Sequence, residues 1–289
     1  MLHGASRCRT LATPRRRLAK RVPVWAPALV LCWTGAGSSL RAQNAPAADE
    51  VIERYVEAIG GSGAHISPRS IRTTGIVEMP GLGLQGTFEV LQLLPNRSLT
   101  RVTIPGIGEI LSGFDGVAGW SVDPLVGASL MAGAELAQAE ERANILATLR
   151  DESVVTSREM IELSESEGEP CWRVRLVWAS GSESLDCYSR DTGLLLASED
   201  TEVTPMGEMV VTTRFSQYEP FYGMVLPTRL VQSALGQVQE LTVEAVVLDD
   251  VDEAELAPPP AIRTLLDGGA RPWGKPSATG TTEREGCAV

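Results

Sequence analysis

Between Ser70 and Leu248 the sequence consists of about a dozen short runs in which apolar and polar residues alternate. A period of two predicts β-strands that each have one buried and one solvated face. Met79-Pro80-Gly81-Leu82-Gly83 and Ile104-Pro105-Gly106-Ile107-Gly108 repeat one turn between such runs. In this turn proline presets φ, and glycine supplies the positive φ that a type II turn needs. Hairpin therefore follows hairpin, which predicts an antiparallel sheet.

The runs fall on both sides of one helical segment. The spacing predicts strands before that segment at about 70–79, 84–94, 97–104, 108–114 and 117–122. It predicts further strands after it at about 153–164, 170–179, 183–189, 193–203, 207–217, 223–233 and 237–248. We therefore expect a mainly β (α+β) chain with a sheet of about 11–12 strands.

Two segments show helical spacing instead. Asp49 can cap a helix that runs to about Ile59, where Gly60-Gly61 stops it. From about Ala132 to Arg150 the apolar residues recur every three to four positions, which predicts a helix inserted into the meander. Two helices are few for so many strands, so we expect the sheet to curl around them, with the inserted helix as a lid over the concave face.

Apolar side chains that alternate with polar neighbours are expected to point inward. They line an apolar cavity or fill a core, and periodicity does not separate these alternatives, because both place the same residues inside. The candidates, including two from the inserted helix, are Phe88, Val90, Trp120, Leu146, Leu149, Trp172, Val174, Leu176, Trp178, Met209, Val211 and Phe215.

Residues 1–42 have the order of an export signal. A basic segment from Arg15 to Arg21 precedes an apolar run from Val22 to Trp33 and small residues that end at Leu40-Arg41-Ala42. The alternative is a membrane anchor, but Pro23 and Pro27 interrupt the run, which is shorter than the ~20 residues a spanning helix needs. We expect cleavage near Gln43 and a periplasmic protein without a transmembrane span, exported by the general or the twin-arginine route.

Removal of this segment changes the charge of the chain. It takes away eight positive and no negative charges from a chain of net charge −12, which leaves −20. A surface this acidic repels nucleic acid and anionic headgroups, so nucleic-acid binding is excluded.

Cys171, Cys187 and Cys287 remain after cleavage. An oxidising compartment favours a bridge between Cys171 and Cys187. The expected hairpin register opposes it, because a turn near Ser180-Gly181-Ser182 sets Cys187 opposite Arg175 and leaves Cys171 ~13 Å away. The sequence therefore does not decide whether Cys171 and Cys187 form a disulfide. These cysteines have no Cys-x-x-Cys spacing or histidine partner, so no metal site is expected.

Catalytic chemistry is not indicated, and we expect neither an enzyme nor a cofactor. His65 lies in a loop without a partner that could orient it, so a solvated residue is expected. No zinc-protease, phosphate-loop or nucleophile-elbow motif occurs. Carboxylates cluster at Glu162 to Glu169 and at Asp249 to Glu255, where solvated charge runs are favoured over a glycosidase pair or a calcium loop.

The domain limits follow from composition. After a spacer at 43–48, the β-domain is expected to span 49–262. Beyond it, 263–289 is rich in Gly, Pro, Thr and Ser and is expected to be a disordered tail.

Three segments carry a resemblance to a known family: Thr74 to Gly81, Cys187 to Leu195, and Leu226-Pro227-Thr228-Arg229. With the helix before them and the inserted helix, they make the chain from about Asp49 to Val251 similar to the LolA-like outer-membrane lipoprotein-sorting superfamily. Members of that superfamily form an unclosed β-barrel with helices as a lid over an apolar cavity, and carry lipoprotein acyl chains or other lipids across the periplasm. The resemblance transfers no binding residue to a numbered position.

The resemblance implies a non-enzymatic periplasmic carrier or binding protein for a lipid or a lipoprotein acyl chain. An alternative is a structural or sensory module of the same fold with a filled core, which binds an envelope protein as its partner. A hydrolase with scattered carboxylates is a further alternative, against which the missing histidine and nucleophile motifs stand.

Overall fold

The computed structural model describes residues 45–204 and 207–268. The expected signal segment, Cys287 and most of the expected tail lie outside these residues. Within them, no helix is long and apolar enough to cross a membrane.

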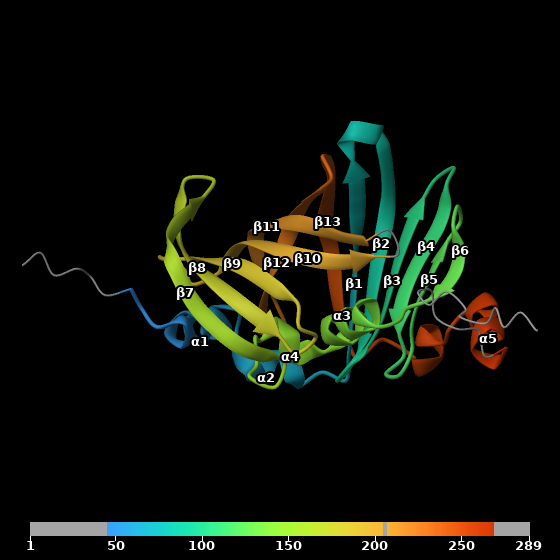
Figure 1. Ribbon diagram of the computed structural model, residues 1–289, viewed down its shortest axis with the longest axis horizontal. Helices are drawn as coiled ribbons and strands as arrows, with labels where there is room; N and C mark the ends of the chain where they lie inside the picture. The colour runs from blue at the N-terminus through green and yellow to red at the C-terminus, as the bar shows by residue number, and fades with distance from the viewer. Residues whose placement is uncertain (1–44, 205–206, 269–289) are drawn as a thin grey trace, which may run out of the picture. The chain divides into compact units, whose positions relative to one another are not determined.

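All described strands join one antiparallel sheet of thirteen strands (Figure 1). They are β1 (Ser70–Met79), β2 (Leu84–Leu93), β3 (Arg97–Ile104), β4 (Gly108–Phe114), β5 (Gly119–Asp123), β6 (Gly127–Leu130), β7 (Val155–Ser166), β8 (Glu169–Trp178), β9 (Glu183–Ser189), β10 (Leu195–Thr204), β11 (Gly207–Phe221), β12 (Met224–Ala234) and β13 (Gln237–Leu248). The expected antiparallel meander is confirmed. The sequence prediction missed only β6, whose four residues are too few to show an alternation.

The sheet consists of two meanders, β1–β6 and β7–β13, which the pairing of β1 with β13 joins. The outermost strands are therefore β6 and β7, and they do not pair with each other. The sheet is curved and unclosed, as expected.

Short helices complete the described structure. They are α1 (Ala48–Ala58), α2 (Gly61–Ile66), η1 (Pro80–Leu82), α3 (Ala134–Ala143), α4 (Ile145–Thr148), η2 (Glu253–Leu256) and α5 (Pro260–Asp267). The inserted helix expected over 132–150 is two helices, because Asn144 has extended backbone (ψ 118°) and its side chain accepts a hydrogen bond from the Leu146 amide at 3.0 Å. Asparagine favours such a cap over a helix interior.

The inserted helices run between the two edge strands and cross the concave face. α3 contacts β10 of one meander and β3, β4 and β5 of the other. In α4, Ile145 is buried with Ile71, Met224 and Val246 at the junction of the meanders. The segment that connects β6 to β7 through α3 and α4 thus lies on the inner side of the curved sheet.

α1 fills part of the concave face. Its apolar stripe of Val51, Ile52 and Tyr55 packs on β8 and β9, where Val174 and Leu176 are fully buried. His65 in α2 is also buried, at 1% exposure, and its Nε2 lies 3.1 Å from the carbonyl oxygen of Ile59. The prediction of a solvated histidine was wrong, because the chain after Gly60 turns back into a second helix and finds this carbonyl.

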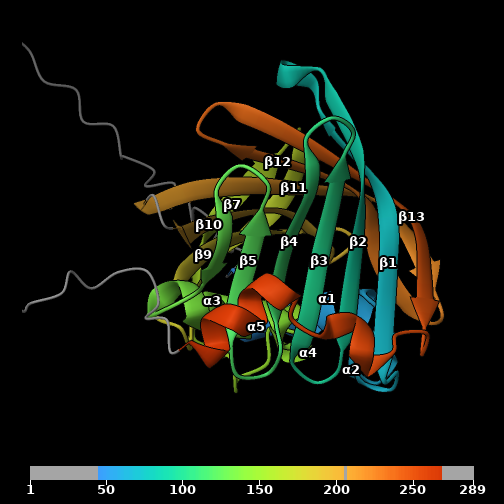
Figure 2. The same ribbon diagram turned by 90° about the vertical axis from the view of Figure 1, so that its right-hand side faces the viewer.

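A second core lies on the convex face of β2–β6. The segment that contains η2 and α5 crosses this face (Figure 2). Leu91, Leu99 and Trp120 lie there under Leu256 of η2 and Ile262 of α5. Gly113 makes room for the indole, because a Cβ at this position would lie 2.5 Å from Cζ2 of Trp120. The prediction that Trp120 points into the concave face was therefore wrong.

The C-terminal segment is correspondingly more ordered than expected. The predicted disordered tail begins at 263, whereas α5 continues to Asp267 and buries Ile262 completely. Pro260 is compatible with the first turn of a helix, so the prolines here start α5. The acidic run that precedes it is not simply solvated, because Glu255 and Asp250 pair with Arg72 and Glu253 pairs with Arg97.

Cys171 and Cys187 form a disulfide, with Cα atoms 5.4 Å apart. The expected register was wrong by two residues, since Cys187 lies opposite Arg173 and Cys171 lies opposite Ser189. The two cysteines are thus diagonal neighbours on adjacent strands, which is within bridging reach.

Replacing Ile262 with Ala tests whether α5 belongs to the folded domain. The loss of a fully buried isoleucine side chain is expected to lower the free energy of unfolding by about 2–4 kcal/mol. Leu266→Ala on the same helix, at a side chain that is 40% exposed, is the control and should change it by less than about 1 kcal/mol. Equal small effects in urea denaturation would contradict the packing of α5.

Candidate functional site

The concave face is filled at one end and hollow in the middle. Among the predicted cavity residues, Leu149, Val174 and Leu176 belong to the core under α1, with Leu146 and Trp172 packed against it. Trp178, Val211 and Phe215 line a cavity, and Met209 with Val211 lines an adjoining groove. The expected alternatives of core and cavity thus both occur, in different parts of one face.

Phe88 and Val90 lie on the concave face of β2, away from these openings. Phe88 is 5% exposed and packs over Gly75 of β1, where a Cβ would lie 2.7 Å from its ring. Val90 is half-buried and opposite Thr100. They belong to the wall of the sheet.

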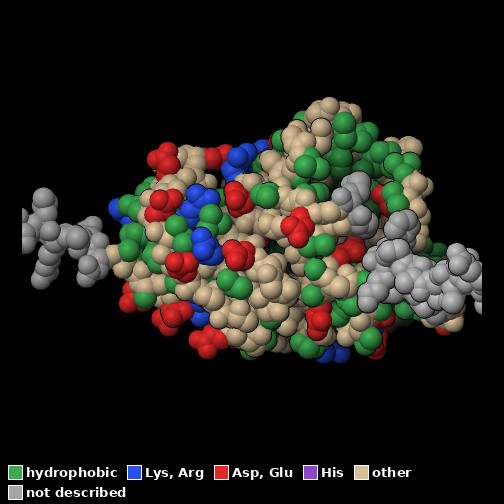
Figure 3. Space-filling view, viewed as in Figure 1, with side chains coloured by type: hydrophobic (Ala, Val, Ile, Leu, Met, Phe, Trp, Pro, Cys, Tyr) green, Lys and Arg blue, Asp and Glu red, His purple; other side chains and the backbone are tan. Residues whose placement is uncertain are grey.

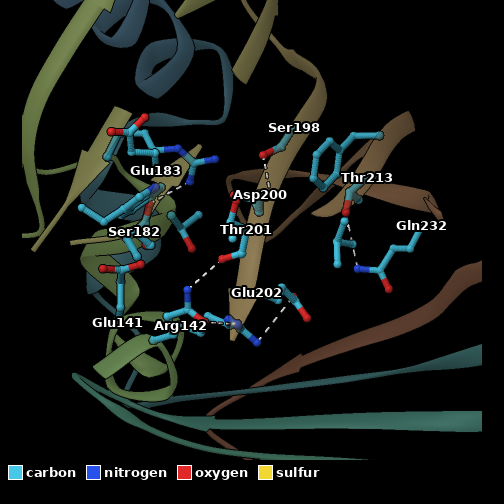
Figure 4. Close-up of a pocket in the computed structure, with 17 residues that line it drawn as sticks. Glu141, Arg142, Ser182, Glu183, Ser198, Asp200, Thr201, Glu202, Thr213 and Gln232 are labelled. Carbon is cyan, nitrogen blue, oxygen red and sulfur yellow. Dashed lines mark hydrogen bonds and ion pairs between the residues drawn. The ribbon is translucent and has the colours of Figure 1, made fainter. Parts of the chain in front are cut away.

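The cavity has a volume of about 260 Å³ and lies between α3 and the strands β10, β11 and β12 (Figure 4). Strand register explains why space remains there. One row across the sheet carries Ser198, Thr213 and Gln232, and the next carries Asp200, Val211 and Ala234. All of these side chains except Gln232 are short, and the cavity lies between them and α3.

Polar and charged groups dominate the lining of this cavity. Figure 4 shows Glu141 and Arg142 of α3 on one side and Asp200 and Glu202 of β10 facing them. The expected apolar hollow is therefore only part of the space. Arg142 Nη1 lies 3.6 Å from Glu202 Oε1, and Ser198 donates a hydrogen bond to Asp200 Oδ2 at 2.7 Å.

Glu202 occupies a central position on the concave face. It lines the cavity and the groove, and also a space of about 310 Å³ on the other side of α3. In that third space the strands of the first meander contribute hydroxyls, from Ser98, Thr100, Ser112 and Ser121. The three spaces therefore adjoin around one carboxylate.

The groove is the more apolar neighbour of the cavity. It has a volume of about 210 Å³ and shares Glu202, Val211 and Gln232 with it. Met79, Leu82, Met209, Ala234 and Val238 supply its apolar wall. Leu82 is 58% exposed in the β1–β2 hairpin, and Figure 3 shows hydrophobic side chains gathered over that hairpin at the upper right.

A buried ion pair closes the cavity toward the α1 core. Arg150 donates from Nε to Asp186 Oδ2 at 3.0 Å, and Tyr188 donates its hydroxyl to the same oxygen at 2.6 Å. Burial alone would lower the pKa of Arg150, but Asp186 and the two tyrosines Tyr188 and Tyr55 raise it well above the usual value. Its guanidinium also lies 5.2 Å from the ring of Trp178. Because Asp186 is fully buried and its charge is paired with the largely buried Arg150, removal of either partner is expected to cost stability.

Gln138 fastens α3 to the sheet. β9 begins at Glu183 and pairs with β10 only as far as Asp200, so the next residues of β10 lack a strand neighbour on that side. The Gln138 side chain takes its place, because its amide nitrogen donates to the Thr201 carbonyl at 2.8 Å and its oxygen accepts from the Val203 amide at 2.9 Å.

Asp200 carries a perturbed carboxyl group. Burial and the charge of Asp186 raise its pKa from 3.8 to about 6. Burial likewise raises the pKa of Glu141, which accepts a hydrogen bond from the Ser180 amide. Among the described residues, no arginine or histidine forms an ion pair with either carboxylate. The surroundings of Asp200 and Glu141 therefore disfavour the ionised form of both carboxyl groups.

Other sites are not indicated. A further hollow of about 720 Å³ lies between α1 and the segment after α4, and its lining mixes carboxylates such as Asp49 and Glu53 with Arg158 and apolar side chains. Within the described residues, no group of three or more histidine, cysteine or acidic side chains is arranged to hold a metal ion.

Comparison with known proteins places the fold. No family model matches the chain, and no curated protein matches it in sequence. A LolA superfamily protein from Nitrosomonas europaea superposes with a TM-score of 0.50 at 15% identity, covering 74% of this chain and 99% of that one. The chain has a LolA-like fold. A DUF1329 family protein from Desulfovibrio piger superposes with a TM-score of 0.52 at 13% identity, covering 74% of this chain and 98% of that one.

Gln138→Leu tests the attachment of α3 in this LolA-like fold. The substitution leaves the Thr201 carbonyl and the Val203 amide without their partner, so we expect a loss of about 1–3 kcal/mol in unfolding free energy. Amide hydrogen exchange at Val203 should accelerate. Glu140→Gln, on the exposed face of α3, is the control. Unchanged exchange at Val203 would show that the helix is held by other contacts.

Asp200→Asn tests whether the pKa of the Asp200 carboxyl group is raised in the folded protein. The folded pKa of about 6 exceeds the usual 3.8, so the folded state binds this proton more tightly. The resulting stabilisation is fully present below about pH 3.8 and is lost as pH rises through about 6. The variant should therefore exceed the wild type by about 1–3 kcal/mol at pH 7.5, and the difference should shrink toward pH 4. A pH-independent difference between their unfolding curves would contradict the assignment.

Proposed function

We propose that this chain is an exported, non-enzymatic binding or carrier protein that holds the apolar chain of a lipid or lipoprotein on its concave face. The groove beside Met209 is the observation that carries the proposal. It is an apolar-walled hollow on the inner face of an open sheet, and no residue of α1–α5 lines it. Pockets that combine apolar walls with a few polar groups are typical of small-molecule sites.

Two further features support binding in preference to catalysis, and a third supports export. The polar groups near the groove are carboxylates, amides and hydroxyls held by the sheet, and no histidine lies among them. His65, the only histidine among the described residues, is buried against the Ile59 carbonyl in α2. The basic, apolar and small-residue order of 1–42 supports export to the periplasm.

The openness of the sheet supports a carrier role. Because β6 and β7 do not pair, a chain can enter from the side of the concave face without breaking strand hydrogen bonds. The space beside α3 continues past Glu202 into the first meander, so a longer ligand has room on both sides of the helix. The LolA-like fold is in keeping with this use, although the fold alone does not assign a function.

A chain-length series tests the proposal. Protein stripped of endogenous lipid is titrated with straight-chain alcohols of increasing length, and binding is followed by calorimetry. Each additional methylene should raise the affinity about fourfold until the groove is full, because its burial contributes ~0.8 kcal/mol. Met209→Trp fills the groove and should abolish the trend.

Val210→Trp is the matched control for that variant. Val210 is the next residue of β11, 53% exposed, and alternation places it on the opposite face of the strand. It should leave the series unchanged. An absence of binding across the series, or equal loss in both variants, would contradict the proposal and favour the partner-binding module with a filled core.

A further inference from the structure

The cavity beside Asp200 has the chemistry of a cation site. Four carboxylates line it, from Glu141, Glu183, Asp200 and Glu202, against the guanidinium groups of Arg142 and Arg150. Arg150 is already neutralised by Asp186, and one lining carboxylate, that of Glu202, faces Arg142. Glu183 pairs with Arg175, whose Nε lies 4.0 Å from Glu183 Oε2. Two lining carboxylates, Glu141 and Asp200, therefore have no ion-pair partner among the described residues.

Burial of these carboxylates strengthens the repulsion between their negative charges. Asp186 behind the wall is fully buried, and its Oδ1 has no hydrogen-bond partner among the described residues. Two of the lining carboxylates, Glu141 and Asp200, have pKa values raised by burial. Charges in such a hollow are screened by salt much less than charges on the surface. A cation placed there would relieve a repulsion that the folded chain otherwise sustains.

The position of the cavity adds an apolar requirement. Glu202, Val211 and Gln232 line both the cavity and the groove, so the two spaces adjoin directly. A molecule that spans them has an apolar portion against Met209 and a polar end among the carboxylates. Trp178 and Phe215 add apolar surface to the cavity wall.

We propose that the Asp200 cavity binds the ammonium headgroup of an amphiphile whose apolar chain occupies the adjoining groove. The inference rests on the proposed function and specifies its ligand class: an amphiphile that ends in a primary or quaternary ammonium. A sulfate, phosphate or carboxylate headgroup without an amine would meet the uncompensated carboxylates and is selected against. Glu141, Asp200 and Glu202 are the residues that set this preference.

Ligands with one chain and different heads separate the two proposals. Decylammonium, decanol and decyl sulfate are titrated calorimetrically below their micellar concentrations, at pH 8 and physiological salt, into protein stripped of lipid. Decylammonium is expected to bind about tenfold or more tightly than the other two. Its preference should diminish at pH 5, where Asp200, with a pKa of about 6, is protonated while an alkylammonium remains charged.

Asp200→Asn is the decisive variant, because it removes one cavity charge and is expected to fold stably. It should lower the affinity for decylammonium about fivefold and leave that for decanol unchanged. Glu199→Gln is the matched control, since it removes the same charge from the neighbouring, exposed residue of β10 on the opposite face of the strand.

The outcomes separate clearly. Equal affinities for the three headgroups would overturn the headgroup assignment and leave chain binding in the groove intact. A loss in Glu199→Gln as large as that in Asp200→Asn would also overturn it, because general attraction to an acidic surface would then explain the preference. Failure of the wild type to bind any of the three would overturn both proposals.

Discussion

The pairing of β1 with β13 is the contact on which the architecture depends. It joins strands nearly at opposite ends of the described chain, from Ile71 opposite Leu248 to Glu78 opposite Glu240. Each meander on its own is a series of local hairpins, but this long-range pairing makes them one sheet with β6 and β7 at its edges. The link from β6 to β7 must then cross the concave face, and that is why α3 and α4 lie there. The hollow spaces on both sides of α3 follow from this crossing.

The arrangement of strands could be predicted from local signals, because hairpins depend on neighbouring residues and turn chemistry. The sequence predicted twelve of the thirteen strands, the antiparallel order and the crossover. It did not predict which of the two faces of a strand is concave. Trp120 illustrates the reason: alternation shows that it is buried, but the partner that buries it is Ile262 of α5, far along the chain. Alternation separates the residues of a strand into two faces, but it does not show which of the two is the concave one.

The candidate site could be predicted only in part. Met209, Val211, Phe215 and Trp178 line the hollow spaces as apolar members of alternating strands. Asp200, Glu202 and Gln138 were not singled out, because a lone polar residue on a strand or helix has the same pattern when it is solvated as when it faces a cavity. Asp186 was not singled out either, although β9, where it lies, is buried almost throughout in the structure. Its partner Arg150 lies in a different element, so no local spacing connects them.

The contact between Gln138 and β10 covers backbone groups at a place where the strand has no neighbour. Beyond Asp200 the strand presents a carbonyl and an amide that a side-chain amide covers instead of a neighbouring strand. An uncovered strand edge is a template on which another chain can add. A displacement of α3 would therefore expose this carbonyl and this amide to another strand. The Gln138 side chain therefore does two things at once, because it holds α3 in place and occupies backbone groups of β10 that could otherwise pair with another chain.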